Sequence, residues 1–413
     1  MPAPSEAMIT LLKGGLSEVR GFSFAGVRAG IKRKGLDLAI IKSDVGPVPA
    51  AGVFTSNLVR AAPILLTERN LRGGRLGAVF LNSGRANCFT GEKGERDAEE
   101  ISERVAGLLG IRPREVGVLS TGLIGAPLPM AKVRRGIPRA VARLSNTREE
   151  SLRVAQSIMT TDTFPKEIAV ATKLGDGTEV RIAGVAKGSG MIRPKLATML
   201  SVILTDARAT PGGLRLALRN AVEGSFNMIT VDNDTSTNDA VLLLASGLAG
   251  GKEISARDID PNFQEALNYV TGELAKMIVR DGEGARHFFE VRVEGARNFY
   301  EAKLAALAVA GSNLVKAAVF GEDPNWGRIV AALGASGAYF DPSNLSLWFQ
   351  GRGGSVYLVK QGRPVRNPDR ARGIMRGREF VIGIKLGEGE ASAKAWGCDL
   401  TYDYVRINAK YRT

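Results

Sequence analysis

Apolar runs of strand length alternate with turn residues through the first half of the chain. Such runs, bounded by glycine or by short polar turns, predict β-strands. They occupy Leu36–Ile41, Ala78–Leu81, Val116–Leu119, Ile168–Thr172 and Glu179–Val185. Between them, helical spacing of the apolar residues predicts helices over Asp97–Leu109 and Arg148–Met159.

The second half continues this alternation. Helical spacing predicts helices over Leu214–Val222 and Asn262–Val279. Apolar runs predict strands at Ser201–Thr205, Ala240–Leu244, Ser355–Val359, Glu379–Leu386 and Tyr402–Ile407. We therefore expect an α/β (α+β) chain with layered sheets sandwiched by helices, and not a helix bundle. A length of 413 residues suggests two or three domains.

The chain is basic, with a formal net charge of +14, which raises the possibility of nucleic-acid binding. Basic residues are spread along the sequence, however, and acidic residues accompany them. The densest basic cluster crosses a break predicted at Gly136 and Pro138 and contains Lys132, Arg134, Arg135, Arg139 and Arg143. We interpret it as a solvated face, and the chain has no motif that interleaves aromatic and basic residues. We expect no nucleic-acid partner.

Cysteine use and hydropathy indicate the compartment. Cys88 and Cys398 are the only cysteines, which favours two buried thiols in a reducing compartment over a disulfide scaffold. The first residues show no basic region followed by an apolar core, and no apolar run reaches 18 residues. We expect a cytoplasmic protein with no membrane partner.

Histidine is nearly absent, and this limits the possible chemistry. His287 is the only one, so a Ser-His-Asp or Cys-His mechanism would have to use it, and its apolar neighbours favour a structural role. One histidine and two cysteines are too few for the usual four-ligand structural zinc site, and no calcium-loop pattern is present. We predict no metal and no cofactor.

The segment Lys187–Leu200 offers a nucleophile that needs no histidine. A loop with two glycines and a serine leads into a basic, proline-containing stretch and then to Ala197-Thr198 and an apolar run. If the Ala197–Thr198 bond is cut, Thr198 gains an α-amine with a pKa near 8 that can act as base for its own hydroxyl. Spacing alone leaves the alternative open that Thr198 merely begins a buried strand.

Several distant segments, in their order along the chain, resemble those of one enzyme family. They are Asn82–Asn87, Ser120–Gly125, Met159–Lys166, Ser225–Asn227, Thr235–Asp239, Phe320–Arg328 and Trp396–Thr413. Together with the loop before Thr198, they are similar to the ornithine acetyltransferase family of arginine biosynthesis, also called glutamate N-acetyltransferase. The resemblance covers nearly the whole chain.

This resemblance implies a self-processing enzyme with an N-terminal threonine nucleophile. Cleavage at Ala197–Thr198 would give an α chain (1–197) and a β chain (198–413), with a smaller C-terminal domain from about 285 to 413. The fold would be that of the DmpA-like self-processing aminopeptidases. The expected assembly is a heterotetramer of two α and two β chains.

The resemblance also implies roles for individual residues. Thr198 would carry the acetyl group from N-acetylornithine to glutamate, and Thr121 and Gly122 would form the oxyanion hole. Residues at the family's substrate-binding positions are Thr161, Lys187, Thr198, Glu283, Asn408 and Thr413. We further expect Lys187 to meet a substrate carboxylate and Glu283 an ammonium group. Acetyl-CoA is possible as a further acetyl donor.

Two alternatives to acetyl transfer remain at this stage. A threonine-nucleophile aminopeptidase or amidase of the same fold would pass the acyl group to water in place of glutamate. A basic nucleic-acid-binding protein would show a steep dependence of duplex binding on salt.

Overall fold

A computed structural model of the chain describes residues 9–193 and 199–410. Three sheets organise these residues. The first is seven-stranded, in the order β1 (Thr10–Leu12), β8 (Lys166–Lys173), β9 (Glu179–Lys187), β10 (Leu200–Ala209), β12 (Ala240–Ile254), β4 (Val48–Phe54), β5 (Arg75–Leu76). The second is four-stranded, in the order β2 (Phe22–Val27), β3 (Leu38–Ser43), β6 (Ala78–Asn82), β7 (Val116–Ser120).

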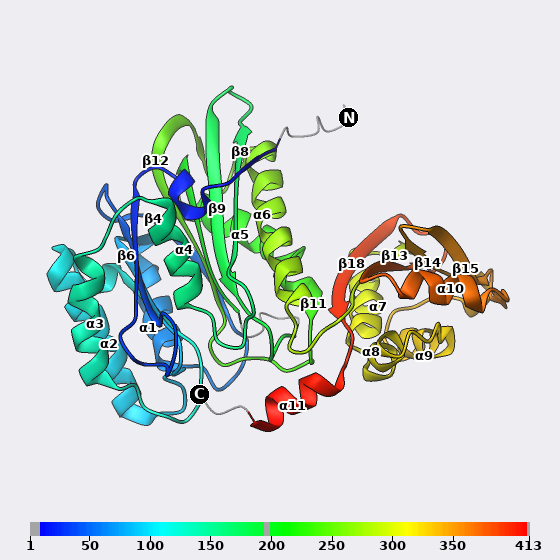
Figure 1. The fold of residues 1–413 in the computed structure, drawn as a ribbon. Helices are drawn as coiled ribbons and strands as arrows, with labels where there is room; N and C mark the ends of the chain where they lie inside the picture. The colour runs from blue at the N-terminus through cyan, green and yellow to red at the C-terminus, as the bar shows by residue number, and fades with distance from the viewer. Residues whose placement is uncertain (1–8, 194–198, 411–413) are drawn as a thin grey trace.

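These two sheets pack face to face and are covered by helices on their outer faces (Figure 1). The core between them includes Phe22, Ile41 and Leu81 from one sheet and Val185 and Val202 from the other, all buried. The outer face of the four-stranded sheet is covered by α2 (Gly91–Leu109) and α3 (Met130–Val141), and that of the seven-stranded sheet by α5 (Pro211–Glu223) and α6 (Pro261–Arg280). The predicted layered α/β architecture is confirmed.

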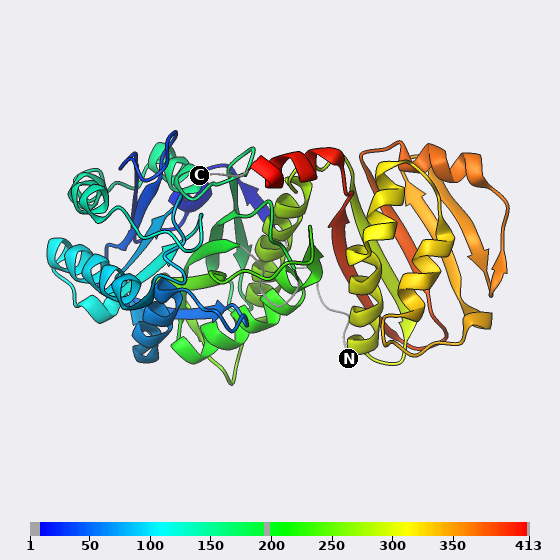
Figure 2. The ribbon, with the colours of Figure 1, turned by 90° about the horizontal axis from the view of Figure 1, so that it is seen from below.

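A third sheet, with its own helices, forms a second body on one side (Figures 1 and 2). Its order is β11 (Ile229–Thr230), β18 (Ala391–Cys398), β13 (Phe288–Ala296), β17 (Glu379–Lys385), β14 (Ser346–Gly351), β15 (Gly354–Lys360), β16 (Arg363–Pro364). The helices of this body are α7 (Phe299–Gly311), α8 (Asn313–Phe320), α9 (Trp326–Gly334) and α10 (Pro368–Met375). Only β11 comes from the chain before residue 285, so this sheet is nearly contiguous in sequence.

The remaining helices are short. They are α1 (Ala62–Asn70), α4 (Arg148–Ser157) and α11 (Tyr402–Lys410), with 3-10 turns at Gly15–Glu18, Leu71–Gly73, Pro113–Glu115, Phe226–Met228 and Pro342–Asn344. Within the described ranges no single helix is long and apolar enough to cross a membrane, although α7 and α8, bent by 52°, pass the same length and composition test as a pair.

Two predictions about local structure are wrong. Residues 402–407 form helix α11, not a strand: the Thr401 hydroxyl accepts the amide of Tyr404 at 3.3 Å and so caps the helix. The break predicted at Gly136 and Pro138 does not occur, because α3 runs through both residues. Gly136 permits a close approach of α3 to β3 and to the loop after β2, since a Cβ there would lie 2.9 Å from Leu38 Cδ1 and 2.7 Å from the Cβ of Ala29.

Candidate active site

Strand register brings the two ends of the 188–199 segment together. Lys187, at the end of β9, lies opposite Leu200, at the start of β10. Leu200 also pairs with Ala240 of β12, and the amide of Met199 donates to Asp239 Oδ1 at 2.8 Å. Ala197 and Thr198 lie outside the described residues. The covalent neighbour of Thr198, Met199, is nevertheless fixed by hydrogen bonds to Asp239 and Ala240.

The turn that follows β7 carries Thr121 and Gly122. Parallel pairing of β6 with β7 places Asn82 opposite Ser120, and the Thr121 amide donates to the Asn82 carbonyl at 3.0 Å. Gly122 has φ +125°, and a Cβ there would lie 2.4 Å from the carbonyl carbon of Gly84. Only glycine fits this position. The Thr121 hydroxyl and the Gly122 amide are the donors that this turn can offer to an oxyanion.

Asn238 connects this turn to the start of β12. Its Nδ2 donates to the carbonyls of Ala86 at 2.7 Å and Ser120 at 2.9 Å. The next residue, Asp239, holds Met199 and is fully buried, and burial raises its pKa well above the usual range. Its Oδ2 has no hydrogen-bond partner in the described part of the chain. Two consecutive side chains, Asn238 and Asp239, therefore couple the Thr121–Gly122 turn to the residue after Thr198.

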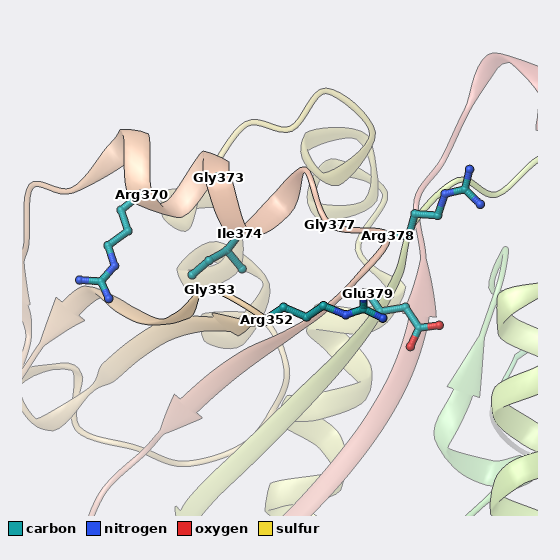
Figure 3. Close-up of a pocket in the computed structure, with 8 residues that line it drawn as sticks. All are labelled: Arg352, Gly353, Arg370, Gly373, Ile374, Gly377, Arg378 and Glu379. Atoms are coloured by element: carbon teal, nitrogen blue, oxygen red, sulfur yellow. The ribbon is translucent and has the colours of Figure 1, made fainter.

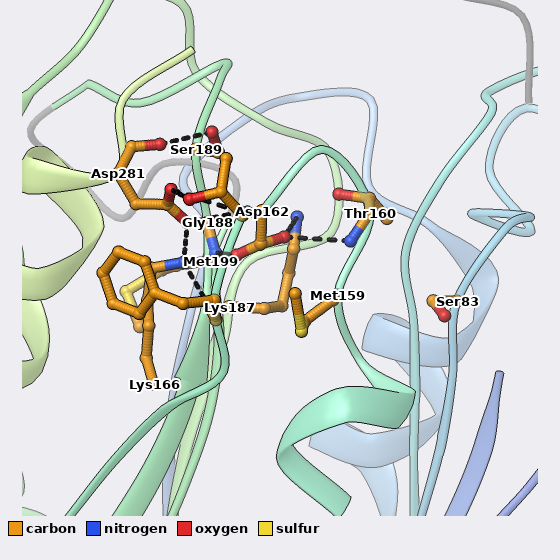
Figure 4. Close-up of polar contacts among 12 residues, drawn as sticks. Ser83, Met159, Thr160, Asp162, Lys166, Lys187, Gly188, Ser189, Met199 and Asp281 are labelled. Carbon is orange, nitrogen blue, oxygen red and sulfur yellow. Dashed lines mark hydrogen bonds and ion pairs between the residues drawn. The ribbon is translucent and has the colours of Figure 1, made fainter. Parts of the chain in front are cut away.

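Four buried charges lie beneath the glycine loop that starts at Gly188 (Figure 4). The Lys166 ammonium contacts Asp162 Oδ1 at 2.7 Å and Asp281 Oδ2 at 2.5 Å. Asp162 Oδ1 also accepts the Gly188 amide at 2.8 Å, and the Lys187 ammonium lies 3.9 Å from Asp162 Oδ2. The two ammonium groups and two carboxylates balance, which is the condition for burying charges at tolerable cost.

Burial and neighbouring charge set the acidity of this cluster. Burial raises the pKa of Asp162, but the Lys187 and Lys166 ammonium groups and the Thr160 amide outweigh it, so that the pKa lies well below its usual range. Burial lowers the pKa of Lys187, against the opposing effect of Asp162. Asp162 is therefore ionised at neutral pH and holds both Lys187 and the loop after it.

Glu283 and Asn408 meet beside the same loop. Asn408 Nδ2, on α11, donates to Glu283 Oε2 at 2.7 Å, and the Glu283 amide donates to the Ser189 carbonyl at 2.9 Å. A Cβ on Gly190 would lie 2.4 Å from the Glu283 carboxylate, so the glycine permits this approach. Charge interaction with Glu283 also acts on Lys187. The structure thus brings Lys187, Glu283 and Asn408 together.

The other predicted residues divide into described and undescribed ones. Thr161 is half-buried, in the loop directly before Asp162. Thr413 lies outside the described residues, as do Ala197 and Thr198. His287 is buried, with Nδ1 2.9 Å from Asp399 Oδ2, and Asp399 Oδ1 accepts the His287 amide. This histidine joins β13 to the end of β18 and lies outside the cluster around Lys187.

Sequence reasoning assigned no role to several side chains of this region. They are Lys32, Asp162, Lys166, Asn238, Asp239 and Asp281. Two of the motifs quoted above contain Asp162, Lys166, Asn238 and Asp239, and the spacing of Asp162 and Lys166 resembles an ordinary surface pair. Their burial was the missing information. No motif marked Lys32 or Asp281.

One cavity of about 840 Å³ lies away from these residues, on the second body (Figure 3). Arg352, Arg370, Arg378 and Glu379 contribute its charged side chains, and none of the predicted site residues lines it. Among the described residues, no group of three or more His, Cys, Asp or Glu side chains could hold a metal ion. Both cysteines are buried free thiols.

Comparison with known proteins identifies relatives over nearly the whole chain. A profile described as the ArgJ family matches residues 23–413. The chain is 52% identical to the arginine biosynthesis bifunctional protein ArgJ of Symbiobacterium thermophilum, over 97% of this chain and 99% of the relative. It is 47% identical to the glutamate N-acetyltransferase of Methanothermobacter thermautotrophicus, over 98% of this chain and 99% of the relative.

Solved structures of two relatives also match. A crystal structure of the arginine biosynthesis bifunctional protein ArgJ of Bacillus halodurans is 36% identical, with a TM-score of 0.44, and covers 47% of this chain and 100% of its own. The ornithine acetyltransferase of Mycobacterium tuberculosis, complexed with ornithine, is 42% identical, with a TM-score of 0.42, and covers 46% of this chain and 100% of its own.

Proposed function

The chain belongs to the ArgJ family, and we propose that it transfers the acetyl group of N-acetylornithine to glutamate through an acetyl-Thr198 ester. It is an enzyme of arginine biosynthesis, a glutamate N-acetyltransferase. The observation that carries the proposed mechanism is the set of contacts around the two residues that follow Thr198. Lys187 pairs with Leu200, Asp239 holds the Met199 amide, and the neighbouring Asn238 bonds to Ser120, directly before the Thr121–Gly122 turn.

The first half-reaction transfers the acetyl group to the enzyme. Thr198 Oγ attacks the acetyl carbonyl carbon while its proton passes to the Thr198 α-amine. The Thr121 hydroxyl and the Gly122 amide stabilise the oxyanion, each by a few kcal/mol (about 3–4). The C–N bond then breaks, the proton moves from the α-ammonium to the departing nitrogen, and ornithine leaves.

The second half-reaction is the same chemistry in reverse. The amine of glutamate attacks the ester carbon, the same donors bind the oxyanion, and the C–O bond to Thr198 breaks. The amine proton passes through the Thr198 α-amine to the departing Oγ. N-acetylglutamate leaves, and Thr198 is restored. Splitting the transfer lets one site serve both amino acids in turn.

The charged residues beside the glycine loop suit amino-acid substrates. In our proposal the Glu283 carboxylate meets the side-chain ammonium of ornithine, and the Lys187 ammonium meets a carboxylate. Asn408 orients Glu283 through the 2.7 Å hydrogen bond. Thr161, half-buried beside Asp162, and Thr413 complete the substrate contacts in this proposal. Reversing each charge and measuring substrate affinity tests the two pairings, and unchanged affinities would rule them out.

In this mechanism the free α-amine of Thr198 acts as the base. The chain must therefore cut itself between Ala197 and Thr198. We propose that the α chain (1–197) and the β chain (198–413) stay associated, as a heterotetramer in the cytoplasm. Strand pairing across the cut supports the association of the α and β chains, because β9 and β10 are neighbours in one sheet. The fragments would share a core and would not separate as domains. No cofactor takes part in this scheme.

Intact mass and a denaturing gel test the mechanism. The wild-type chain should give two fragments, and Thr198→Ala should remain one inactive chain of 43.9 kDa. An active wild-type enzyme that stays uncut would overturn the proposal. Competition between glutamate and water for the acetyl group separates a transferase from an amidase. An assay with acetyl-CoA as the sole donor decides whether that compound is also a substrate.

A further inference from the structure

Lys32 lies at the edge of the candidate site on a loop with a defined shape. The buried carboxylate of Asp37 accepts the amides of Ala29 at 2.6 Å, Gly30 at 2.9 Å and Lys32 at 2.9 Å. From this loop the Lys32 ammonium reaches the carbonyl of Met159 at 2.7 Å. Met159 begins the segment that leads to Thr161 and Asp162, so Lys32 reaches across to that segment.

The stem of Lys32 packs on Gly84, and Gly84 packs on Gly122 of the Thr121–Gly122 turn. A Cβ on Gly84 would lie 2.7 Å from Lys32 Cγ, and a Cβ on Gly122 would lie 2.4 Å from the Gly84 carbonyl carbon. Lys32, Gly84 and Gly122 are therefore stacked in direct contact. The ammonium of Lys32 stands between the oxyanion turn and the loop that carries Asp162.

Lys32 differs from the other two lysines of the site in its charge balance. Lys166 and Lys187 face carboxylates, whereas the Lys32 ammonium contacts only a neutral carbonyl within the part of the chain that the structure describes. Burial lowers the pKa of Lys32. The charges of Asp37 and Asp162 oppose this decrease, whereas the charge of Lys187 lowers the pKa of Lys32 further. A half-buried cation without a paired carboxylate is a good receptor for an anion.

We propose that Lys32 binds the α-carboxylate of both substrates, an inference that rests on the proposed function. In N-acetylornithine and in glutamate the carbon that bears the reacting nitrogen also bears this carboxylate. When the acetyl carbon sits at the Thr121–Gly122 turn, the α-carboxylate must therefore lie close to that turn, and Lys32 is separated from it only by Gly84. In this arrangement Lys187, which interacts electrostatically with Glu283, binds the γ-carboxylate of glutamate.

Two amides of glutamate separate these assignments. Glutamate α-amide lacks the α-carboxylate charge, and glutamine lacks the γ-carboxylate charge. For the cut wild-type enzyme, kcat/KM should fall about 10- to 150-fold from glutamate to the α-amide, the loss expected for one hydrogen bond between charged groups. In Lys32→Met, whose side chain keeps the apolar stem on Gly84, this preference should disappear, whereas the preference for glutamate over glutamine should remain.

The controls address folding and charge. Lys34→Met, at an exposed position of the same loop, should behave as the wild type, and Lys32→Arg should recover part of the preference. Cleavage into two fragments reports that Lys32→Met has folded. If it does not fold, the wild-type preference for glutamate over the α-amide still tests the proposal.

An unchanged preference in Lys32→Met, or no preference in the wild type, overturns the assignment of Lys32 while leaving acetyl transfer standing. A wild-type enzyme that cannot move acetyl from N-acetylornithine to glutamate refutes the proposed function itself.

Discussion

Removing the charge of Asp162 should unfold the protein at a much lower temperature. In Asp162→Asn the amide group must replace one oxygen, either the one that faces Lys166 and the Gly188 amide or the one that accepts the Thr160 amide. A donor then faces donors, and the Lys187 ammonium loses the carboxylate at 3.9 Å. Removing one partner of a buried ion pair costs about 3–5 kcal/mol.

This loss is measurable as a melting shift with a defined pH dependence. At roughly 2–4 °C per kcal/mol, Asp162→Asn should melt about 6–20 °C below the wild type near neutral pH. Because the folded-state pKa of Asp162 lies below its unfolded value, the stabilisation is complete above that unfolded value, near pH 4, and is lost as the pH falls through the folded pKa. The gap between the variants should therefore narrow below about pH 4.

The matched control is Asp44→Asn. Asp44 forms a surface pair with Lys42 at 3.4 Å, with 39% of its side chain exposed. Such pairs contribute at most about 1 kcal/mol, so the control should melt within about 4 °C of the wild type. Differential scanning calorimetry from about pH 3 to about pH 8 makes the comparison, because this range includes the first part of the loss, just below the unfolded-state pKa near 4. A shift for Asp162→Asn no larger than the control, or one independent of pH, would refute the assignment of a buried balanced cluster.

Three further changes test other parts of the site. Gly122→Ala should lower kcat by about 100-fold or more, because its φ of +125° and a Cβ contact of 2.4 Å displace a donor to the oxyanion. The control Gly107→Ala, in α2 with an ordinary helical backbone and open space around its Cβ, should retain kcat. Asn408→Ala should lower kcat/KM for N-acetylornithine about 10- to 150-fold by removing the donor to Glu283, and unchanged kinetics would contradict that contact. Deleting residues 411–413 should strongly lower activity while self-cleavage persists, and a fully active truncated enzyme would remove these residues from the site.

Local pattern predicted most elements of the fold because they obey simple periodicities. The strands near residues 78–81 and 116–119 and the helices over 97–109 and 262–279 are present, with ends that shift by a few residues. One predicted strand is a helix in the structure. Residues 402–407 have enough apolar and aromatic character for a strand, but α11 buries none of its residues fully, so no sheet face selects the extended form. Capping by Thr401 decides the outcome.

Sequence also determined the family and the residue types of the chemistry. The sequence alone contains a single histidine, a glycine loop and motifs in a fixed order. These features suffice to select Thr198, Thr121 and Gly122 as candidates. Ala197, Thr198 and Thr413 lie outside the described residues, so their assigned roles remain predictions. The reason for glycine at position 122 became clear only when Gly84 was seen to occupy the space of a side chain.

Only the tertiary structure decided which charges belong to the site. Nothing in the sequence marks Asp162, Lys166 and Asp281 as buried charges, because their burial depends on contacts between segments more than a hundred positions apart. The role of Lys32 could not be predicted from the sequence either, since nothing near it in sequence indicates that its ammonium reaches Met159. The sequence fixes the ionisable group of a side chain, but its partner, its desolvation and therefore its pKa are set by the packing of distant segments.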